Sequence, residues 1–483
     1  MRLRNIFIII VLLFGCFFVN SQNKQLLYDF NEVPQALLLN PGMKTSFKWY
    51  AGVPLISGFS FQAGSSGLKS NDLFANDGVD FNTKFREKVI YGMDFSDELS
   101  GTYQVELLNI GFRSKNNEDI FYSFGAYNEG DAIGYFFKDY ALLAYEGNTN
   151  NLNKKFDLNH LKTRGEILNV YHFGINKKIS NELTMGFRAK VYSSLLNFTS
   201  TKNKGYFVTT QGDDNLLEST LEADVEIKTS GVFELKDIID DDSQANGAAI
   251  SSVLGKRALL GGNLGVGFDL GFTYNIDERT VFTGSLIDVG FIYHSKDVRT
   301  YSVKGFASTE GLEVRLPEDL NSTEDQWRTF VDDLEDLVPY EEGSDNYITF
   351  RPTKFYTSIR RDFGKEIESK EACYCTSTSG GNNRGRVYKN SYGAQLYAIN
   401  RPRGPQAALS AFYQHRLGNV MSLKTTYTID KFSYTNIGLG ASLQAGPVNM
   451  YLMADNLIGY SNLANSKYAS VQFGLNIISW GKK

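Results

Sequence analysis

The chain has 483 residues and a formal net charge of −5, with 28 Tyr, 35 Phe and 45 Gly but only 9 Pro and 3 Cys. So few cysteines exclude a disulfide-stapled scaffold, and aromatic residues together with glycine favour strands. Length alone would allow two or three domains, but the pattern along the chain predicts one, and no nucleic-acid partner is expected.

The N-terminus predicts export. Two arginines precede an unbroken apolar run from Ile6 to Val19, which is the layout of a secretory signal peptide over residues 1–21. A small residue at Ser21 fits a cleavage site that leaves Gln22 as the new N-terminus.

Two alternatives exist for this leader. An uncleaved anchor helix would need about 20 apolar residues, and the run is shorter. A lipoprotein box would acylate Cys16, but Phe14 is bulky where such a box has a small residue.

A short apolar plug precedes the first strand. In "PQALLLNPGMK", Pro34 suits the first turn of a helix and Pro41-Gly42 end it. Residues 22–45 are therefore predicted to form a periplasmic or lumenal segment that either moves or merely anchors the chain entry. The candidate plug residues are Leu37, Leu38, Leu39, Asn40, Pro41 and Gly42.

Period-two alternation dominates the rest of the chain. In "NLGVGFDLGFT" at 263–273, one face is apolar and the other is small or polar, and the pattern recurs at 436–443 and 469–477. A soluble β-sandwich would also alternate. Many such segments of about 9 to 11 residues after a signal peptide favour an all-β, transmembrane antiparallel barrel in the outer membrane of a Gram-negative cell.

About fourteen strands are predicted within a barrel domain at residues 46–483. They lie at 46–64 (interrupted at Pro54), 102–113, 119–127, 167–178, 183–200, 262–274, 280–292, 349–363, 386–399, 405–416, 420–430, 433–444, 447–457 and 467–479.

The connections alternate between short and long, as in barrels with short periplasmic turns and long outer loops. The long ones are residues 65–101, 128–166, 201–261 and 293–348. This parity predicts that both termini are periplasmic. One periplasmic connection, 364–385, is too long for the rule.

That exceptional loop holds Cys373 and Cys375, a candidate redox or disulfide pair, since envelope thiols exchange with oxidants. The alternative is a flexible Ser/Gly-rich loop. Zinc is disfavoured because it takes about four ligands and the four histidines are scattered.

One outer loop contains an acidic stretch at 322–343 with apolar residues at helical spacing, which predicts one short helix that Pro339 ends. The carboxylates of this stretch, and those at 237–243, could bind calcium or a basic partner. Neither run has the spacing of a calcium loop, so a solvated lid over the barrel mouth is favoured.

No enzyme motif is present, and no catalytic residue, metal or cofactor is predicted. "GVGFDLG" at 265–271 lies inside a strand rather than at a strand-to-helix turn. The inward positions of the strands instead give a candidate set of lumenal residues: Arg188, Lys190, Asp269 and Arg360.

The runs "LLLNPG", "YAGVPLISGFSFQAGSSGLKSNDLF", "SLIDVGFI" and "IGLGASLQAGPVNMYLMADNLIG" resemble uncharacterised outer-membrane barrels of Bacteroidota, similar to PorP/SprF-like proteins. That resemblance implies an association with type IX secretion and gliding motility. A more distant similarity is to FadL-type channels for hydrophobic compounds, whose hatch carries Asn-Pro-Ala-Gly. Asn40, Pro41 and Gly42 match that element in part.

Three hypotheses follow. The barrel is a scaffold or accessory that holds a secreted surface protein or a secretion component in outer-membrane lipid. Alternatively, it is a FadL-like channel for an apolar small molecule. The third hypothesis is a soluble secreted β-protein.

Overall fold

The computed structural model describes residues 24–212, 217–240, 246–310, 340–367, 387–432, 434–460 and 463–480. The predicted cleavage site at Ser21 and Gln22 and the pair Cys373 and Cys375 lie outside these residues. In the described ranges, every helix is too short or too polar to cross a membrane.

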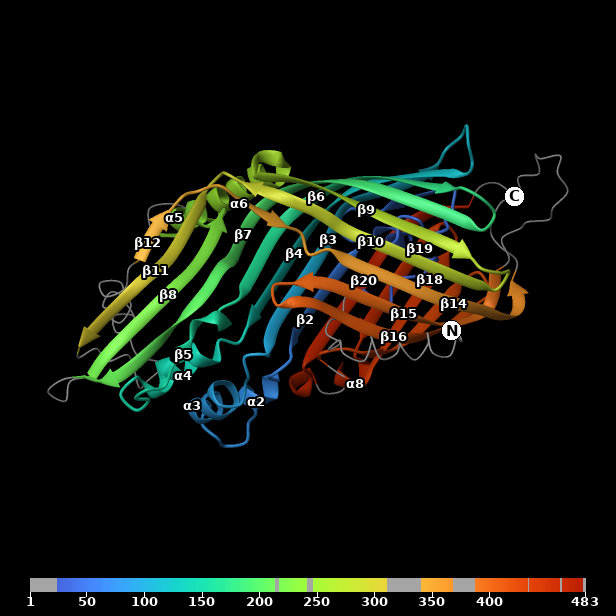
Figure 1. Ribbon diagram of the computed structural model, residues 1–483. Coiled ribbons are helices and arrows are strands. Elements are labelled where there is room, and N and C mark those ends of the chain that lie inside the picture. The colour runs from blue at the N-terminus through green and yellow to red at the C-terminus, as the bar shows by residue number, and fades with distance from the viewer. Residues whose placement is uncertain are drawn as a thin grey trace, which may run out of the picture.

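Fourteen strands form a closed antiparallel barrel, which confirms the predicted fold (Figure 1). The first position is shared by β1 (Trp49–Gly52) and β2 (Phe59–Ser65), and both pair with β3 on one side and with β20 on the other, so the sheet closes. In order around the wall follow β3 (Glu98–Arg113), β4 (Ile120–Tyr135), β6 (Thr163–Lys178), β7 (Leu183–Gln211), β9 (Asn263–Asn275), β10 (Thr280–His294), β13 (Tyr347–Phe350) with β14 (Lys354–Ile367), β15 (Val387–Arg401), β16 (Gly404–Leu417), β17 (Met421–Ile429), β18 (Asn436–Ala445), β19 (Val448–Asp455) and β20 (Tyr468–Ser479).

The outer face of the wall is apolar because each strand alternates. On β9, Leu264, Val266 and Leu270 are all more than 40% exposed, whereas Asn263 and Asp269 are buried on the inward side. The same alternation holds on β18 and β20. An apolar band around a closed barrel is the surface that such proteins present to lipid.

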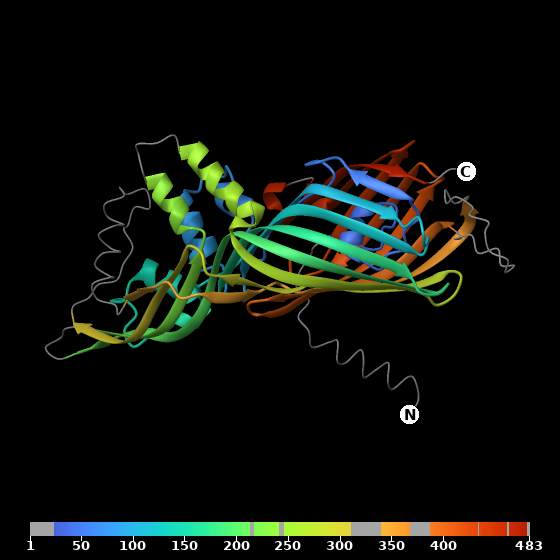
Figure 2. The ribbon, with the colours of Figure 1, turned by 90° about the horizontal axis from the view of Figure 1, so that it is seen from above.

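Part of two predicted outer loops is a sheet. β7 continues far beyond residue 200 and pairs there with β8 (Leu217–Ser230), which pairs with β11 (Val298–Glu310), and β11 pairs with β12 (Tyr340–Gly343). This outer sheet projects beyond the barrel (Figure 2). Its strands were expected as loops at 201–261 and 293–348, although β8 alternates between apolar and charged residues from Leu221 to Lys228 and so carried a strand signal.

Short helices occupy the connections that were predicted to be outer loops, and they are more numerous than the one that was expected. They are α2 (Ser70–Phe74), α3 (Phe81–Lys84), the π-helix η2 (Phe85–Ile90), α4 (Lys138–Glu146) beside β5 (Phe156–Asp157) and η3 (Leu158–His160), α5 (Phe233–Asp240), α6 (Asn246–Lys256) with the π-helix η5 (Arg257–Gly261), α8 (Leu457–Tyr460) and η6 (Leu463–Asn465). The helix predicted in the stretch 322–343, which Pro339 ends, lies outside the described residues, and the four residues after Pro339 form strand β12.

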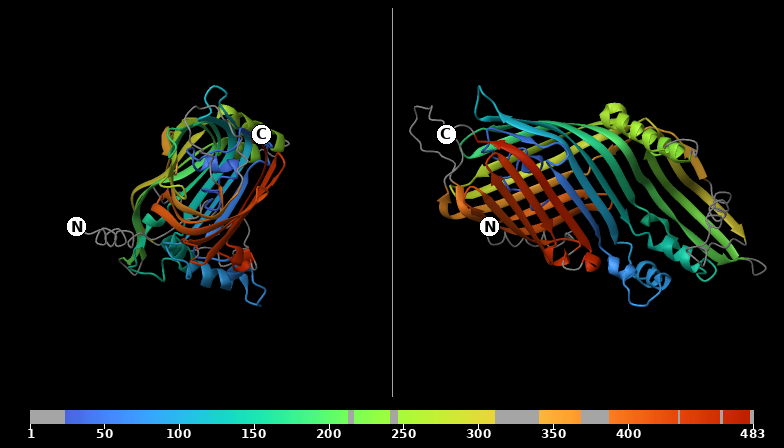
Figure 3. Two further views of the ribbon diagram at one scale, coloured as in Figure 1. Left: turned by 90° about the vertical axis from the view of Figure 1, so that its right-hand side faces the viewer. Right: turned by 180° about the vertical axis from the view of Figure 1, so that it is seen from behind.

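The N-terminal segment lies inside the barrel (Figure 3). We call residues 24–47 the plug; its one regular element is the 3₁₀-helix η1 (Pro34–Leu38). Leu26, Phe30 and Phe47 are completely buried and form the main hydrophobic core together with side chains from the inner wall. The main hydrophobic core of this protein therefore lies inside the barrel, between the plug and the inner wall.

The lipid-facing assignment predicts a depth-dependent cost of charge on one face of β9. Leu270→Arg places a cation near the middle of the apolar band and should lower the free energy of unfolding by about 2 to 4 kcal/mol, whereas Tyr274→Arg at the strand end should cost about 0 to 1 kcal/mol. Denaturant unfolding in lipid vesicles measures both. Equal costs for the two variants would contradict a membrane-embedded band.

Candidate functional site

The plug packs its apolar side chains against aromatic residues of the inner wall. Tyr28 stacks on Tyr356 of β14, with ring centroids 4.9 Å apart, and Tyr356 lies 4.6 Å from Tyr397 of β15. Leu38 packs against a second cluster that contains Tyr127 and other wall residues. The plug thus covers a patch of aromatic side chains on the inner surface of the wall.

Asn40, Pro41 and Gly42 form a tight turn against the wall. The Asn40 side chain accepts a hydrogen bond from the Gly42 amide at 2.9 Å and donates one to the Phe272 carbonyl at 3.1 Å. Asn176 of β6 donates to the Pro41 carbonyl at 2.7 Å. The three predicted residues therefore end η1 and also attach it to β6 and β9.

Two wall glycines make this contact sterically feasible. A Cβ at Gly186 of β7 would lie 2.0 Å from the Pro41 carbonyl oxygen, and one at Gly271 of β9 would lie 2.2 Å from Asn40 Oδ1. Glycine inside a strand often marks such a close approach of another backbone.

Arg188 of β7 donates hydrogen bonds to the turn of the plug that precedes Asn40. Its guanidinium donates to the Leu38 carbonyl at 3.1 Å and to the Leu37 carbonyl, and its Nη1 lies 2.9 Å from Asp269 Oδ2. Arg188 is 1% exposed and Asp269 is 0% exposed. A charge buried this deeply needs a paired countercharge, and Asp269 supplies it.

Lys190 and Arg360, the other two candidate lumenal residues, also have carboxylate partners. Lys190 Nζ lies 2.9 Å from Asp269 Oδ2, so it shares one carboxylate with Arg188. Arg360 Nη1 lies 2.6 Å from Asp29 Oδ1 of the plug. The structure thus brings Arg188, Lys190 and Asp269 together and places Arg360 in a separate contact with the plug.

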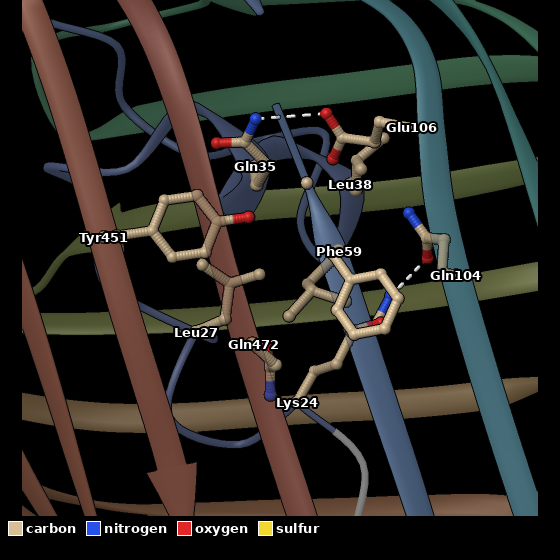
Figure 4. Close-up of a pocket in the computed structure, with 12 residues that line it drawn as sticks. Lys24, Leu27, Gln35, Leu38, Phe59, Gln104, Glu106, Tyr451 and Gln472 are labelled. Atoms are coloured by element: carbon tan, nitrogen blue, oxygen red, sulfur yellow. Dashed lines mark hydrogen bonds between the residues drawn. The ribbon is translucent and has the colours of Figure 1, made fainter. Parts of the chain in front are cut away.

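Gln35 joins the plug to the seam of the barrel (Figure 4). Its Nε2 donates to Glu106 Oε2 at 3.1 Å and to Asn476 Oδ1 at 2.8 Å, and its Oε1 accepts from Asn476 Nδ2 at 2.9 Å. Glu106 lies on β3 and Asn476 on β20, the two strands that flank the first one. Lys24 donates to Gln104 beside this contact.

Sequence reasoning missed most of these plug contacts. Beyond Asp29, Gln35 and Glu106, it missed Glu32 of the plug, whose carboxylate accepts from Arg416 Nε at 2.5 Å. Period-two alternation could have identified Glu106 and Arg416, since both stand on inward positions of clear strands. Within the described residues, no three His, Cys, Asp or Glu side chains are grouped to hold a metal ion.

The glycine contact can be tested with a reporter cysteine. Gly186→Ala should displace the plug, because the added Cβ overlaps the Pro41 carbonyl, and a cysteine at buried Ala36 should then react several-fold faster with a water-soluble maleimide. Gly134→Ala is the matched control, since its Cβ would have Thr163 Oγ1 at 3.8 Å as its nearest neighbour. Unchanged labelling in Gly186→Ala would contradict a plug held by this contact.

Several solved barrels align with most of the chain at low similarity. The Pseudomonas putida toluene transporter TodX is 10% identical, with a TM-score of 0.36 and coverage of 95% of this chain and 94% of that one. The Ralstonia pickettii toluene transporter TbuX is 8% identical (TM-score 0.39, 92% and 93% covered). A Pseudomonas aeruginosa FadL homologue is 9% identical (TM-score 0.39, 93% and 94% covered).

These similarities are too weak to transfer any property of those proteins to this chain. No curated protein matches the sequence. A family model does match, over residues 41–455, and its description is "Family of unknown function (DUF5723)". The match covers most of the chain, so this protein belongs to the DUF5723 family.

Proposed function

We propose that this protein is an outer-membrane channel for a small amphipathic molecule and that the plug closes it. The observation that carries the proposal is the plug itself, a segment of the chain's own N-terminus that occupies the lumen. Its apolar side chains lie on wall tyrosines and its backbone carbonyls accept from wall side chains such as Arg188. The inner wall therefore offers both apolar surface and hydrogen-bond donors to a molecule that takes the place of the plug.

The membrane assignment rests on the apolar outer band and on the predicted signal peptide over residues 1–21. Within the part of the chain described, the wall's outward side chains on β9, β18 and β20 are predominantly apolar or small. A bacterial cell exposes such a barrel to lipid in its outer membrane.

The plug is built to be exchangeable. Beyond Phe47 it continues directly into β1, but its ties to the rest of the wall in the described structure are hydrogen bonds, ion pairs and apolar contacts. A hydrogen bond contributes only about 0.5 to 1.5 kcal/mol net, because water replaces the lost partner. The plug could leave as one segment while β1 stays in the sheet.

The amphipathic character of the solute follows from the wall beneath the plug. Tyr356 and Tyr397 supply aromatic surface, whereas Arg188, Asp269 and Arg360 supply charges and hydrogen-bond donors and acceptors. A purely apolar solute would not replace the hydrogen bonds that Arg188 and Arg360 donate to the plug, at a cost of about 1 to 3 kcal/mol for each buried donor left without an acceptor.

The scaffold hypothesis stays as a second candidate because of the outer sheet. β8 and β11 extend away from the barrel (Figure 2), and a surface protein or a type IX secretion component could bind there. A partner that co-purifies in equal amount with the full chain, but not with a variant lacking the outer sheet, would favour this candidate.

Plug removal tests the channel. Deleting residues 24–44 should raise the conductance in planar bilayers above that of the full-length protein, because the deleted segment fills the lumen. Heat-modifiable migration on gels serves as the folding control. A folded, inserted deletion variant that conducts no better than the full chain, and that admits no solute in liposome swelling, would contradict the proposal.

A lock provides the converse test. With Cys373 and Cys375 replaced by serine, cysteines at Gln35 and Asn476 should be joined by a short, cleavable thiol cross-linker, since these side chains touch. Solute entry should be abolished while the link is intact and return after cleavage. If solute entry is the same with the cross-link intact and after its cleavage, the plug need not move for the solute to pass.

A further inference from the structure

Two neighbouring wall strands are interrupted at the same height. In β10, Leu286 pairs with Leu270 of β9 and Val289 pairs with Phe268, so β10 carries one extra residue, and Asp288 has a positive φ of 61°. The next strand is broken at residues 351–353, between β13 and β14. Bulges bend the strand that contains them. We call this part of the wall the dent.

Buried charges hold the dent in shape. The Asp288 carboxylate lies 2.6 Å from Lys190 Nζ and 2.8 Å from Lys354 Nζ, and its backbone amide donates to Asp269 Oδ1 at 2.7 Å. Asp288 is 2% exposed. Because the Asp288 carboxylate is shared between Lys190 of β7 and Lys354 of β14, the dent is held from both sides.

Arg351, at the break in the dent, reaches across the lumen. Its guanidinium forms ion pairs with Glu129 of β4 and Glu166 of β6, and it stacks over the Tyr192 ring at 5.2 Å. Four strands, β10, β9, β7 and β6, separate the break from β4 around the wall. The contact therefore joins parts of the wall that are far apart in the sheet.

A second pair joins the same regions. Arg401 at the outer end of β15 lies 2.6 Å from Asp131 of β4, with five strands between them on the shorter way around the wall. Farther along, Gln406 of β16 donates to Glu98 of β3 at 2.7 Å. We call Arg351, Glu129, Glu166, Arg401 and Asp131 the latch.

The latch lies on the outer side of the plug. β15 starts at its periplasmic end, so Gln395, which donates to the plug at Gln25, precedes Arg401 on the way out. Arg351 is 2% exposed and Glu166 is 4% exposed, whereas Arg401 and Asp131 are each 8% exposed. These buried ion pairs therefore occupy the lumen at a second level, outside the plug.

We propose that the latch is a second gate, in series with the plug, and that a solute passes only when both are open. This inference rests on the proposed channel. Ion pairs suit a gate because the attraction between two buried charges is largely offset by the cost of removing them from water. When the walls separate, water returns to both charges and recovers that cost, so the latch opens more readily than its short distances suggest.

Charge reversal tests the latch directly. Asp131→Arg, Arg401→Asp and the two combined are each made in the full-length chain and in the variant lacking residues 24–44, and conductance is recorded in planar bilayers. Plug deletion alone should give small, intermittent currents. Either single reversal added to it should raise the current several-fold and make it steady, and the combined reversal should restore the intermittent state because the pair re-forms.

The full-length single reversals should stay closed, since the plug remains. Arg361→Asp is the matched control: it makes the same charge change on an exposed side chain near a periplasmic turn and should leave the current unchanged. Should Asp131→Arg prevent membrane insertion, judged by gel migration, Asp131→Asn replaces it and should act in the same direction.

The outcomes separate the two proposals. Plug-deleted variants that all conduct equally, or a combined reversal that fails to restore the intermittent state, would overturn the latch and leave the channel intact. If every plug-deleted variant folds, inserts and carries no current, the channel is overturned and the latch with it.

Discussion

A closed strand wall turns every second side chain inward, and those side chains must find partners inside a narrow space. This constraint governs the protein. Half of each strand meets lipid and is apolar, so the polar residues and glycines gather on the other half. In the lumen they can be satisfied by water, by one another or by an inserted segment. Here the described lumen uses the last two: the plug occupies its inner part and ion pairs between opposite walls occupy its outer part.

The strands of the wall were predictable because the sequence signal for each strand lies within the strand itself. Alternation within about 10 residues identifies a strand and its two faces, and all fourteen wall strands were located in this way. The boundaries were less accurate where a strand changes its surroundings. β7 was expected to end near residue 200, but it continues into the outer sheet, where its alternation of polar and apolar residues fades.

The inner contacts were not predictable in the same way because their partners are distant in sequence. Alternation places Arg188, Lys190, Asp269 and Arg360 on the inward face, but it does not say which of them meet. Asp131 and Arg401 are 270 residues apart, and Arg351 and Glu129 are 222 apart. Such pairs depend on barrel diameter, strand tilt and the dent in β10, none of which leaves a periodic signal. Asn40, Pro41 and Gly42 carried a local signal for the end of a helix, but that signal does not identify the glycines that they contact, Gly186 and Gly271.

The contact between Gln35 and Asn476 bears on assembly order. These residues are 441 positions apart, and Asn476 lies on the last strand, which closes the sheet by pairing with the first. The partners of Gln35 therefore come together only after the sheet has closed. The contact with Asn476 thus depends on the last strand, whereas the contacts of the plug with β6 and β7 do not.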